Sequence, residues 1–240
     1  MKYTENYRVA LHDLDINGIA SASAVMRRME EAAGRQYAAA GMPLGEMRNN
    51  NRVFILSKTC LSLYRPLYEN DLIGVQTWAA ESKGYSFNRC GRILRKDEII
   101  AEWIAVFALI DPRDRRLLRV EDNPPPVETE EMLELDIPRR VLIPADLPMA
   151  LRGEHTVSYA DCDRNFHMNN TVYADLLCGF LPEMRERRVI SLLINFLREA
   201  PLGTSFKVYH GENDGSHCFR TVLEDGKKGV EAQLLLDTIE

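Results

Sequence analysis

Hydrophobic and polar positions follow the same order of patterns twice along the 240 residues of the chain. Alternating runs at 7–11 (YRVAL) and 155–159 (HTVSY) predict strands, because successive strand residues point to opposite faces. Each run leads through a polar stretch into apolar residues that recur every three or four positions, between Met26 and Ala40 and again between Tyr173 and Phe180. This spacing predicts a helix in each half.

Further alternating runs, joined by short polar turns, follow each predicted helix, and Arg65 in the first half aligns with Arg198 in the second. The expected strands are 54–67, 72–81, 85–95 and 99–111, then 191–202, 205–213, 217–225 and 229–237. Each half is therefore expected to be one long helix packed on an antiparallel sheet. This makes the chain an α+β protein built from two tandem repeats.

A stretch of different character separates the repeats. Residues 123–140 (NPPPVETEEMLELDIPRR) contain three consecutive prolines and an acidic run, which predict a semi-rigid, solvated connector. The expected organisation is an N-terminal repeat at 1–122, a linker at 123–152 and a C-terminal repeat at 153–240.

Composition limits the classes of function. With 45% apolar and 28% charged residues the chain can build a sizeable core, and its net charge of −6 argues against a general nucleic-acid binder. Five cysteines without a CxxC spacing fit reduced thiols rather than a disulfide framework. We find no secretory signal and no run of about 20 apolar residues that could span a membrane, so a cytoplasmic location is expected.

A polar frame, Asp-x-Asp-x-Asn, occurs at 13–17 and again 148 positions later at 161–165. Only the second copy is followed by a histidine, His167, where the first has Ile19. A histidine titrates near neutral pH and can take a proton from water, whereas isoleucine cannot. The frame offers too few ligands for a metal, so no metal is expected.

The second copy also carries a family resemblance. The spaced string from Tyr159 to Tyr173 (YADCDRNFHMNNTVY) and the downstream NFLREA at 195–200 resemble the acyl-ACP thioesterases of plant plastids and their bacterial relatives. The resemblance implies a double hotdog fold and a second half that carries the catalytic residues. By position these are Asp163, Asn165, His167 and Glu199. Ala200 stands where that family has a cysteine, which favours direct attack by water on the substrate.

The expected activity is hydrolysis of the thioester of fatty acyl-acyl carrier protein to free fatty acid and carrier thiol, without a cofactor. The sequence leaves open whether His167 or a carboxylate removes the proton from water. Asn169 or Asn170 is expected to cap the helix near Thr171, so that backbone N–H groups lie near the developing oxyanion. The resemblance places chain-length selection in the first half, where Val25, Met26 and Met29 are candidate walls; the substrate-binding set also includes Asn169 and Asn170.

Acyl carrier protein is acidic, so its docking surface is expected to be basic. The candidates are Arg113, Arg115, Arg116, Arg185, Arg187 and Arg188. Two alternatives remain open: an acyl-CoA thioesterase of the same fold, and a non-catalytic acyl-binding protein. His12, His155 and His210 show no partner pattern, and His217 is expected to be inert. Acyl-chain length, saturation preference and the choice between monomer and homodimer lie beyond the sequence.

Overall fold

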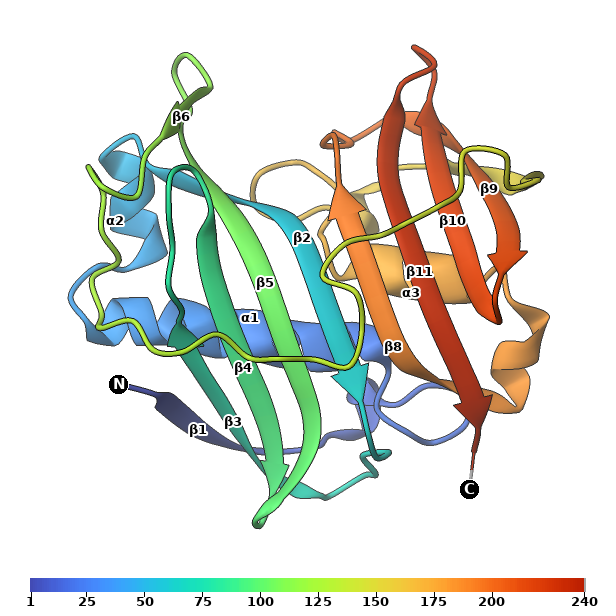
Figure 1. Cartoon of the computed structure of the whole chain (residues 1–240), viewed down its shortest axis with the longest axis horizontal. Coiled ribbons are helices and arrows are strands. Elements are labelled where there is room, and N and C mark those ends of the chain that lie inside the picture. The colour runs from blue at the N-terminus through green and yellow to red at the C-terminus, as the bar shows by residue number, and fades with distance from the viewer. Residues whose placement is uncertain (240) are drawn as a thin grey trace.

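The computed structural model describes residues 1–239, which form one continuous antiparallel sheet with helices on one face (Figure 1). The strands run in the order β1-β3-β4-β5-β2-β8-β11-β10-β9-β7, and β6 pairs with β5. The first half supplies β1 (Tyr3–Arg8), β2 (Val53–Leu63), β3 (Leu72–Ala79), β4 (Phe87–Arg95), β5 (Glu98–Asp111) and β6 (Arg116–Leu118). The second supplies β7 (Ala150–Thr156), β8 (Arg187–Phe196), β9 (Ser205–Asn213), β10 (Ser216–Leu223) and β11 (Lys228–Thr238).

The two halves are joined where β2 pairs with β8 (Figure 1). Cys60 lies opposite Leu193 at the centre of this pairing, flanked by Lys58 opposite Asn195 on one side and Ser62 opposite Ser191 on the other. Equivalent residues of β2 and β8 differ by 133 positions, so Lys58 corresponds to Ser191 and Ser62 to Asn195. Exchanging the two halves therefore converts one flanking pair into the other and leaves the register unchanged. The sheet therefore has an internal two-fold axis between β2 and β8, as a sequence duplication requires.

The helices α1 (Ala22–Ala39) and α3 (Val172–Cys178) lie against the same face of the sheet, and α2 (Leu44–Asn49) lies beside β2. Arg27 of α1 and Asp175 of α3 are 3.8 Å apart, close enough for an ion pair between the helices. The main core fills the space between this helical layer and the sheet. Fully buried members include Met26, Met29, Trp103, Leu192 and Phe219.

The linker covers the other face of the sheet (Figure 1), and the expectation of a solvated connector is wrong. Leu133 and Val141 are buried against Trp78, Ile104 and Leu193. The linker is also hydrogen-bonded to both halves, since the Trp78 indole N–H donates to the Glu131 carbonyl at 2.9 Å and the Leu142 N–H donates to Gln233 at 2.8 Å. Apolar residues spaced between its charges cover a surface that water would otherwise reach.

Three expected boundaries are corrected. The first strand of each half begins earlier than expected, at Tyr3 and at Ala150, and ends before its turn. The second helix has only seven residues. Equivalent residues of the two halves differ by 148 positions before the helices and by 133 after them. The difference arises because the first half has a longer helix, α1, and an additional helix, α2. Because β8 ends at Phe196, Glu199 lies in a loop and not in a strand.

Candidate active site

The two polar frames fold into the same turn. The Asp163 N–H donates to the His167 carbonyl at 3.0 Å, and its Oδ1 accepts from the Asn165 N–H at 2.7 Å. The corresponding bonds in the first half, from Asp15 to the carbonyl opposite and from the Asn17 N–H to Asp15, are both 2.8 Å. Short-range bonds from an aspartate to the backbone two residues on explain why both copies keep this residue type.

The third residue after the second aspartate of each frame has a left-handed backbone: φ is 73° at Gly18 and 61° at Phe166. Glycine adopts this conformation without cost, whereas phenylalanine does so only when the surrounding bonds require it. The Phe166 carbonyl accepts from the Leu202 N–H at 2.9 Å, which ties the second-half turn to the loop after β8.

That loop brings Glu199 to His167. The Met168 N–H donates to the Ala200 carbonyl at 2.9 Å, and His167 forms an isolated bridge with Pro201. Nδ1 of His167 is then 3.8 Å from Oε1 of Glu199, and the side chains are 32% and 29% exposed. The distance suits an ion pair when His167 is protonated, and the partial exposure admits water to the ring.

Asn165 is held from both sides. Its Nδ2 donates to Asp163 Oδ2 at 2.9 Å, and its Oδ1 accepts a hydrogen bond from Arg48 of α2, in the other half. The amide is therefore oriented by a carboxylate and a guanidinium, with one Nδ2–H left to donate. Sequence reasoning missed Arg48, since nothing in its local sequence distinguishes it from other surface arginines.

Arg115 also reaches the site from the first half. It lies in the turn between β5 and β6, and its Nη2 donates to Glu199 Oε2 at 2.7 Å. Glu199 thus has one oxygen toward His167 and the other toward Arg115. We expected Arg115 to contact a carrier protein, but the structure places its side chain against a candidate catalytic carboxylate.

These groups line a cavity of about 790 Å³ where the two halves meet, here named the junction cavity. All four candidate catalytic residues, Asp163, Asn165, His167 and Glu199, border it. Its apolar walls come from both halves: Val53, Phe54, Ile55, Leu56 and Ile110 from the first, and Met168, Tyr173, Phe196 and Ala200 from the second. Charged side chains also border it, namely Arg48, Arg115, Arg198 and Asp225.

The asparagines that precede α3 differ in what they offer. Oδ1 of Asn169 accepts from the N–H and hydroxyl of Thr171, the residue before the helix, at 2.9 and 2.8 Å. Asn169 is therefore committed to the turn and does not line the junction cavity. Asn170 does line it, and neither its backbone N–H nor its side chain is bonded to another residue in the described chain.

A second cavity, of about 280 Å³, lies between α1, α2 and the sheet and is here named the α1 cavity. It shares Asp163, Asn165 and Asn170 with the junction cavity, so the two are contiguous. Its α1 wall consists of Glu30, Ala33, Gly34 and Tyr37, whose spacing defines one helix face.

The walls expected from the sequence lie elsewhere. Met26 and Met29 are fully buried in the main core and border none of the three cavities, and Val25 borders a third cavity, on the other side of the two-fold axis. The face that does line the α1 cavity carries small residues, Ala33 and Gly34, next to an ionisable one, Glu30. A carboxylate on an otherwise apolar helix face was the signal that could have identified it.

Glu30 has a perturbed environment. Its Oε1 is buried without a hydrogen-bond partner in the described chain, although the residue as a whole is only partly buried. Burial, with a smaller contribution from the negative charge of Asp163, raises the pKa of Glu30 to about 7. Burial therefore favours the neutral carboxylic acid form of Glu30, which lies beside the turn that contains Asp163.

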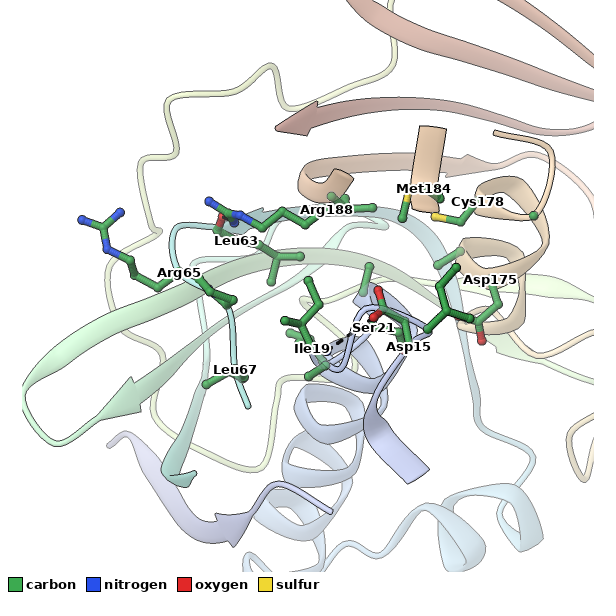
Figure 2. A pocket seen from close by; sticks show the side chains of 18 residues that line it. Asp15, Ile19, Ser21, Leu63, Arg65, Leu67, Asp175, Cys178, Met184 and Arg188 are labelled. Atoms are coloured by element: carbon green, nitrogen blue, oxygen red, sulfur yellow. Dashed lines mark hydrogen bonds between the residues drawn. The ribbon is translucent and has the colours of Figure 1, made fainter. Parts of the chain in front are cut away.

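The third cavity, of about 270 Å³, is the two-fold counterpart of the junction cavity and is shown in Figure 2. Ile19 occupies the position of His167, and Pro66 that of Glu199; Ile19 pairs with Tyr68 as His167 pairs with Pro201. In Figure 2 the cavity lies between Ile19 and Leu63 of the first half and Met184 and Cys178 of the second.

Asn17, the counterpart of Asn165, donates its Nδ2 to the Met184 carbonyl at 2.7 Å, whereas the corresponding group of Asn165 donates to Asp163. The counterpart cavity thus retains the turn but has Ile19 and Pro66 where the junction cavity has His167 and Glu199.

The remaining candidate docking arginines are divided between opposite ends of the sheet. Arg113 is bonded to Asp111 at 2.7 Å and Arg116 lies 3.6 Å from Asp114, both exposed at the end that carries the junction cavity. Arg185 and Arg187 are exposed at the other end. Arg188 is buried, donates to the Leu63 carbonyl and borders the counterpart cavity, so its expected place on a docking surface is wrong.

His155 and His210, for which the sequence predicted no partner, each have a hydrogen-bond partner in the structure. His155 Nε2 is 3.1 Å from Oδ2 of Asp161, which also accepts from the Ser158 N–H. Burial opposes ionisation of Asp161, but the bonds from Ser158 and the charge of His155 outweigh it and lower the pKa of Asp161. The first aspartate of the frame therefore fastens the strand to the turn.

His210 and His217 form a buried pair, with Nε2 of His210 3.1 Å from Nδ1 of His217. Arg152 donates to Nδ1 of His210, and Glu183 lies 3.5 Å from Nε2 of His217. The arginine fixes Nδ1 of His210 as an acceptor, so Nε2 carries the proton that binds His217. The result is a hydrogen-bonded chain remote from the junction cavity.

A histidine, two carboxylates and an amide border one cavity between two fused repeats of a helix on an antiparallel sheet, the arrangement of double-hotdog proteins. The chain belongs to the acyl-ACP thioesterase family: the family's N-terminal domain matches residues 1–124 and its C-terminal domain residues 147–235.

Solved structures confirm the predicted fold. An acyl-ACP thioesterase from Bacteroides thetaiotaomicron has a TM-score of 0.86 at 17% identity, with 98% of each chain covered. The 12:0-ACP thioesterase from Umbellularia californica has a TM-score of 0.84 at 17% identity, covering 99% of this chain and 98% of that one.

The curated relatives found by sequence are longer proteins than this chain. The chloroplastic oleoyl-acyl carrier protein thioesterase of Coriandrum sativum is 21% identical over 205 residues, which are 76% of this chain and 54% of that protein. The chain spans about half the length of the curated relatives it matches. Within residues 1–239, no helix is both long enough and apolar enough to cross a membrane.

Proposed function

We propose that this protein hydrolyses the thioester of a fatty acyl-acyl carrier protein to a free fatty acid and the carrier thiol. The observation that carries the proposal is the convergence of Asp163, Asn165, His167 and Glu199 on the junction cavity, in a chain that belongs to the acyl-ACP thioesterase family. The reaction needs water but no cofactor.

In the proposed mechanism His167 is the general base. Its Nδ1 faces Glu199, which stabilises the protonated ring, and Nε2 is left to take a proton from water. The water oxygen bonds to the thioester carbon to form a tetrahedral intermediate. The carbon–sulfur bond then breaks, and His167 returns its proton to the departing thiolate.

The oxyanion of that intermediate needs donors. The free Nδ2–H of Asn165 and the unbonded N–H and amide of Asn170 border the same cavity and are proposed to supply them. Ala200, which also borders the cavity, has no nucleophile, and this supports attack by water over an acyl-cysteine intermediate.

The test uses purified protein, acyl chains of several lengths on acyl carrier protein, and a reagent that detects free thiol. His167→Ala should lower kcat by at least about 100-fold, the usual contribution of a general base, with an unchanged circular dichroism spectrum. The matched control is His12→Ala, an exposed histidine just before the equivalent first-half turn, which should keep full activity.

Two results would contradict the proposal. Equal rates with the same acyl group on coenzyme A and on the carrier would indicate an acyl-CoA thioesterase, and binding without thiol release would indicate an acyl-binding protein. The carrier partner and the cytoplasmic location remain predictions.

A further inference from the structure

Arg89 of β4 borders the α1 cavity as a buried arginine, 5% exposed. Its Nη1 donates to Gln36 at 2.7 Å and to the Thr77 hydroxyl at 3.1 Å, and the guanidinium lies over the Tyr37 ring. Its Nη2 is buried and has no partner among residues 1–239. None of the carboxylates in that range lies within 4.0 Å of the guanidinium.

A buried charged arginine with an unpaired donor would be destabilising in a cavity that binds only hydrocarbon. Arginine stays charged in proteins, so it cannot relieve its burial by losing a proton. A buried donor left unsatisfied is destabilising, and a hydrocarbon chain in the cavity would exclude the water that could satisfy it. An oxygen atom on the ligand would satisfy it.

The position of Arg89 indicates which part of a ligand it would meet. In the sheet order, β4 is three strands from β8, so the two are separated by about 14 Å at the usual strand spacing. The walls between them are apolar: Phe54, Leu56, Phe87 and Phe107 all border the α1 cavity. A chain with its thioester at His167 would cross these rings and place its far end at Arg89.

We propose that Arg89 binds an oxygen atom at the far end of the acyl chain, so that the favoured substrates are medium-chain acyl groups with a terminal hydroxyl or carboxylate. This rests on the proposed function for the position of the thioester. Three other arginines, Arg48, Arg52 and Arg164, also border the α1 cavity, but all three are exposed to water. Arg89 is the arginine of this cavity whose guanidinium is buried with a donor that has no partner among residues 1–239.

The experiment compares octanoyl, decanoyl and dodecanoyl groups on acyl carrier protein with their terminally hydroxylated and carboxylated counterparts. In the wild type, kcat/KM should be about tenfold higher for the oxygenated member of one pair, as expected for satisfying a buried donor. In the Arg89→Met variant, kcat/KM should be about equal for the plain and the oxygenated member of that pair.

Arg92→Gln is the matched control, because Arg92 lies on the same strand but is paired with Glu102. This variant should keep the wild-type preference. Equal wild-type rates within every pair, or an Arg89→Met variant that retains the preference, would overturn the proposal. The wild-type comparison decides the question even if Arg89→Met does not fold.

Calorimetry separates this proposal from the function on which it rests. The free acids, plain and terminally hydroxylated, are titrated into wild-type protein without any turnover. Tighter binding of the hydroxylated acid supports the Arg89 site even if no carrier substrate is hydrolysed, an outcome that would refute only the thioesterase activity. Equal binding of both acids counts against the site.

Discussion

The guanidinium of Arg115 and the carboxylate of Glu199 are joined across the two halves of the molecule by a hydrogen bond of 2.7 Å. Arg115 has a left-handed backbone, with φ of 57°, at the tip of the turn after β5. The turn thereby directs a first-half side chain toward the second-half site. The pair is 72% and 29% exposed, so its effect is on the position of Glu199 more than on stability.

Replacing Arg115 should therefore alter the chemical step. We expect Arg115→Gln to lower kcat severalfold, since Glu199 is less firmly held beside His167, while KM for the acyl carrier substrate changes less than about twofold. Arg113→Gln is the control, because Arg113 is bonded to Asp111 and does not border the cavity. A raised KM that depends on salt, with unchanged kcat, would instead make Arg115 a docking residue.

Asn165 and Asn17 are equivalent in the turn but differ in their partners, so their variants should differ in kind. Asn165→Ala should lower kcat by about 100-fold, the usual cost of losing one oxyanion donor. Asn17→Ala loses the bond to the Met184 carbonyl and should reduce the unfolding free energy by about 1 kcal/mol with kcat unchanged. Steady-state kinetics and urea denaturation distinguish the two; similar effects on kcat would remove Asn165 from the mechanism.

Glu30 should make stability depend on pH. Burial raises its folded-state pKa to about 7, above the ordinary value of 4.5, so the folded protein holds a proton that the unfolded chain has lost between these values. Its contribution to stability is present at low pH and declines as pH rises through this window. Compared with wild type, Glu30→Gln should gain unfolding free energy by at most about 1.4 kcal/mol per pH unit there. If the difference in unfolding free energy between wild type and Glu30→Gln is constant from pH 4.5 to 7, the raised pKa of Glu30 is contradicted.

The linker should contribute to stability through Leu133. This residue is 6% exposed among Cys60, Trp78 and Ile104, so Leu133→Ala should lower the unfolding free energy by about 2 kcal/mol or more. Glu134→Ala, at the exposed neighbouring position, should change it by less than about 0.5 kcal/mol. A Leu133→Ala variant as stable as wild type would restore the view of the linker as a solvated connector.

Local patterns predicted the features that depend on neighbouring residues. The duplication, the strands after each helix and the Asp-x-Asp-x-Asn turns were recognisable because alternation, turn residues and short-range side-chain bonds are properties of a few adjacent positions. The same reasoning missed the burial of Leu133 and the length of α3, which depend on what the rest of the chain places against them.

The sequence by itself determined that one half carries an ionisable turn and the other an apolar one, since His167 and Ile19 are visible in the repeats. Only the tertiary structure decided which residues join that turn. Arg48 and Arg115 come from the first half, and the helix face of Glu30 and Tyr37 rather than that of Met26 and Met29 borders the neighbouring cavity. The physical reason is that the pairing of β2 with β8 sets which surfaces meet across the two-fold axis, and that register involves residues more than 100 positions apart.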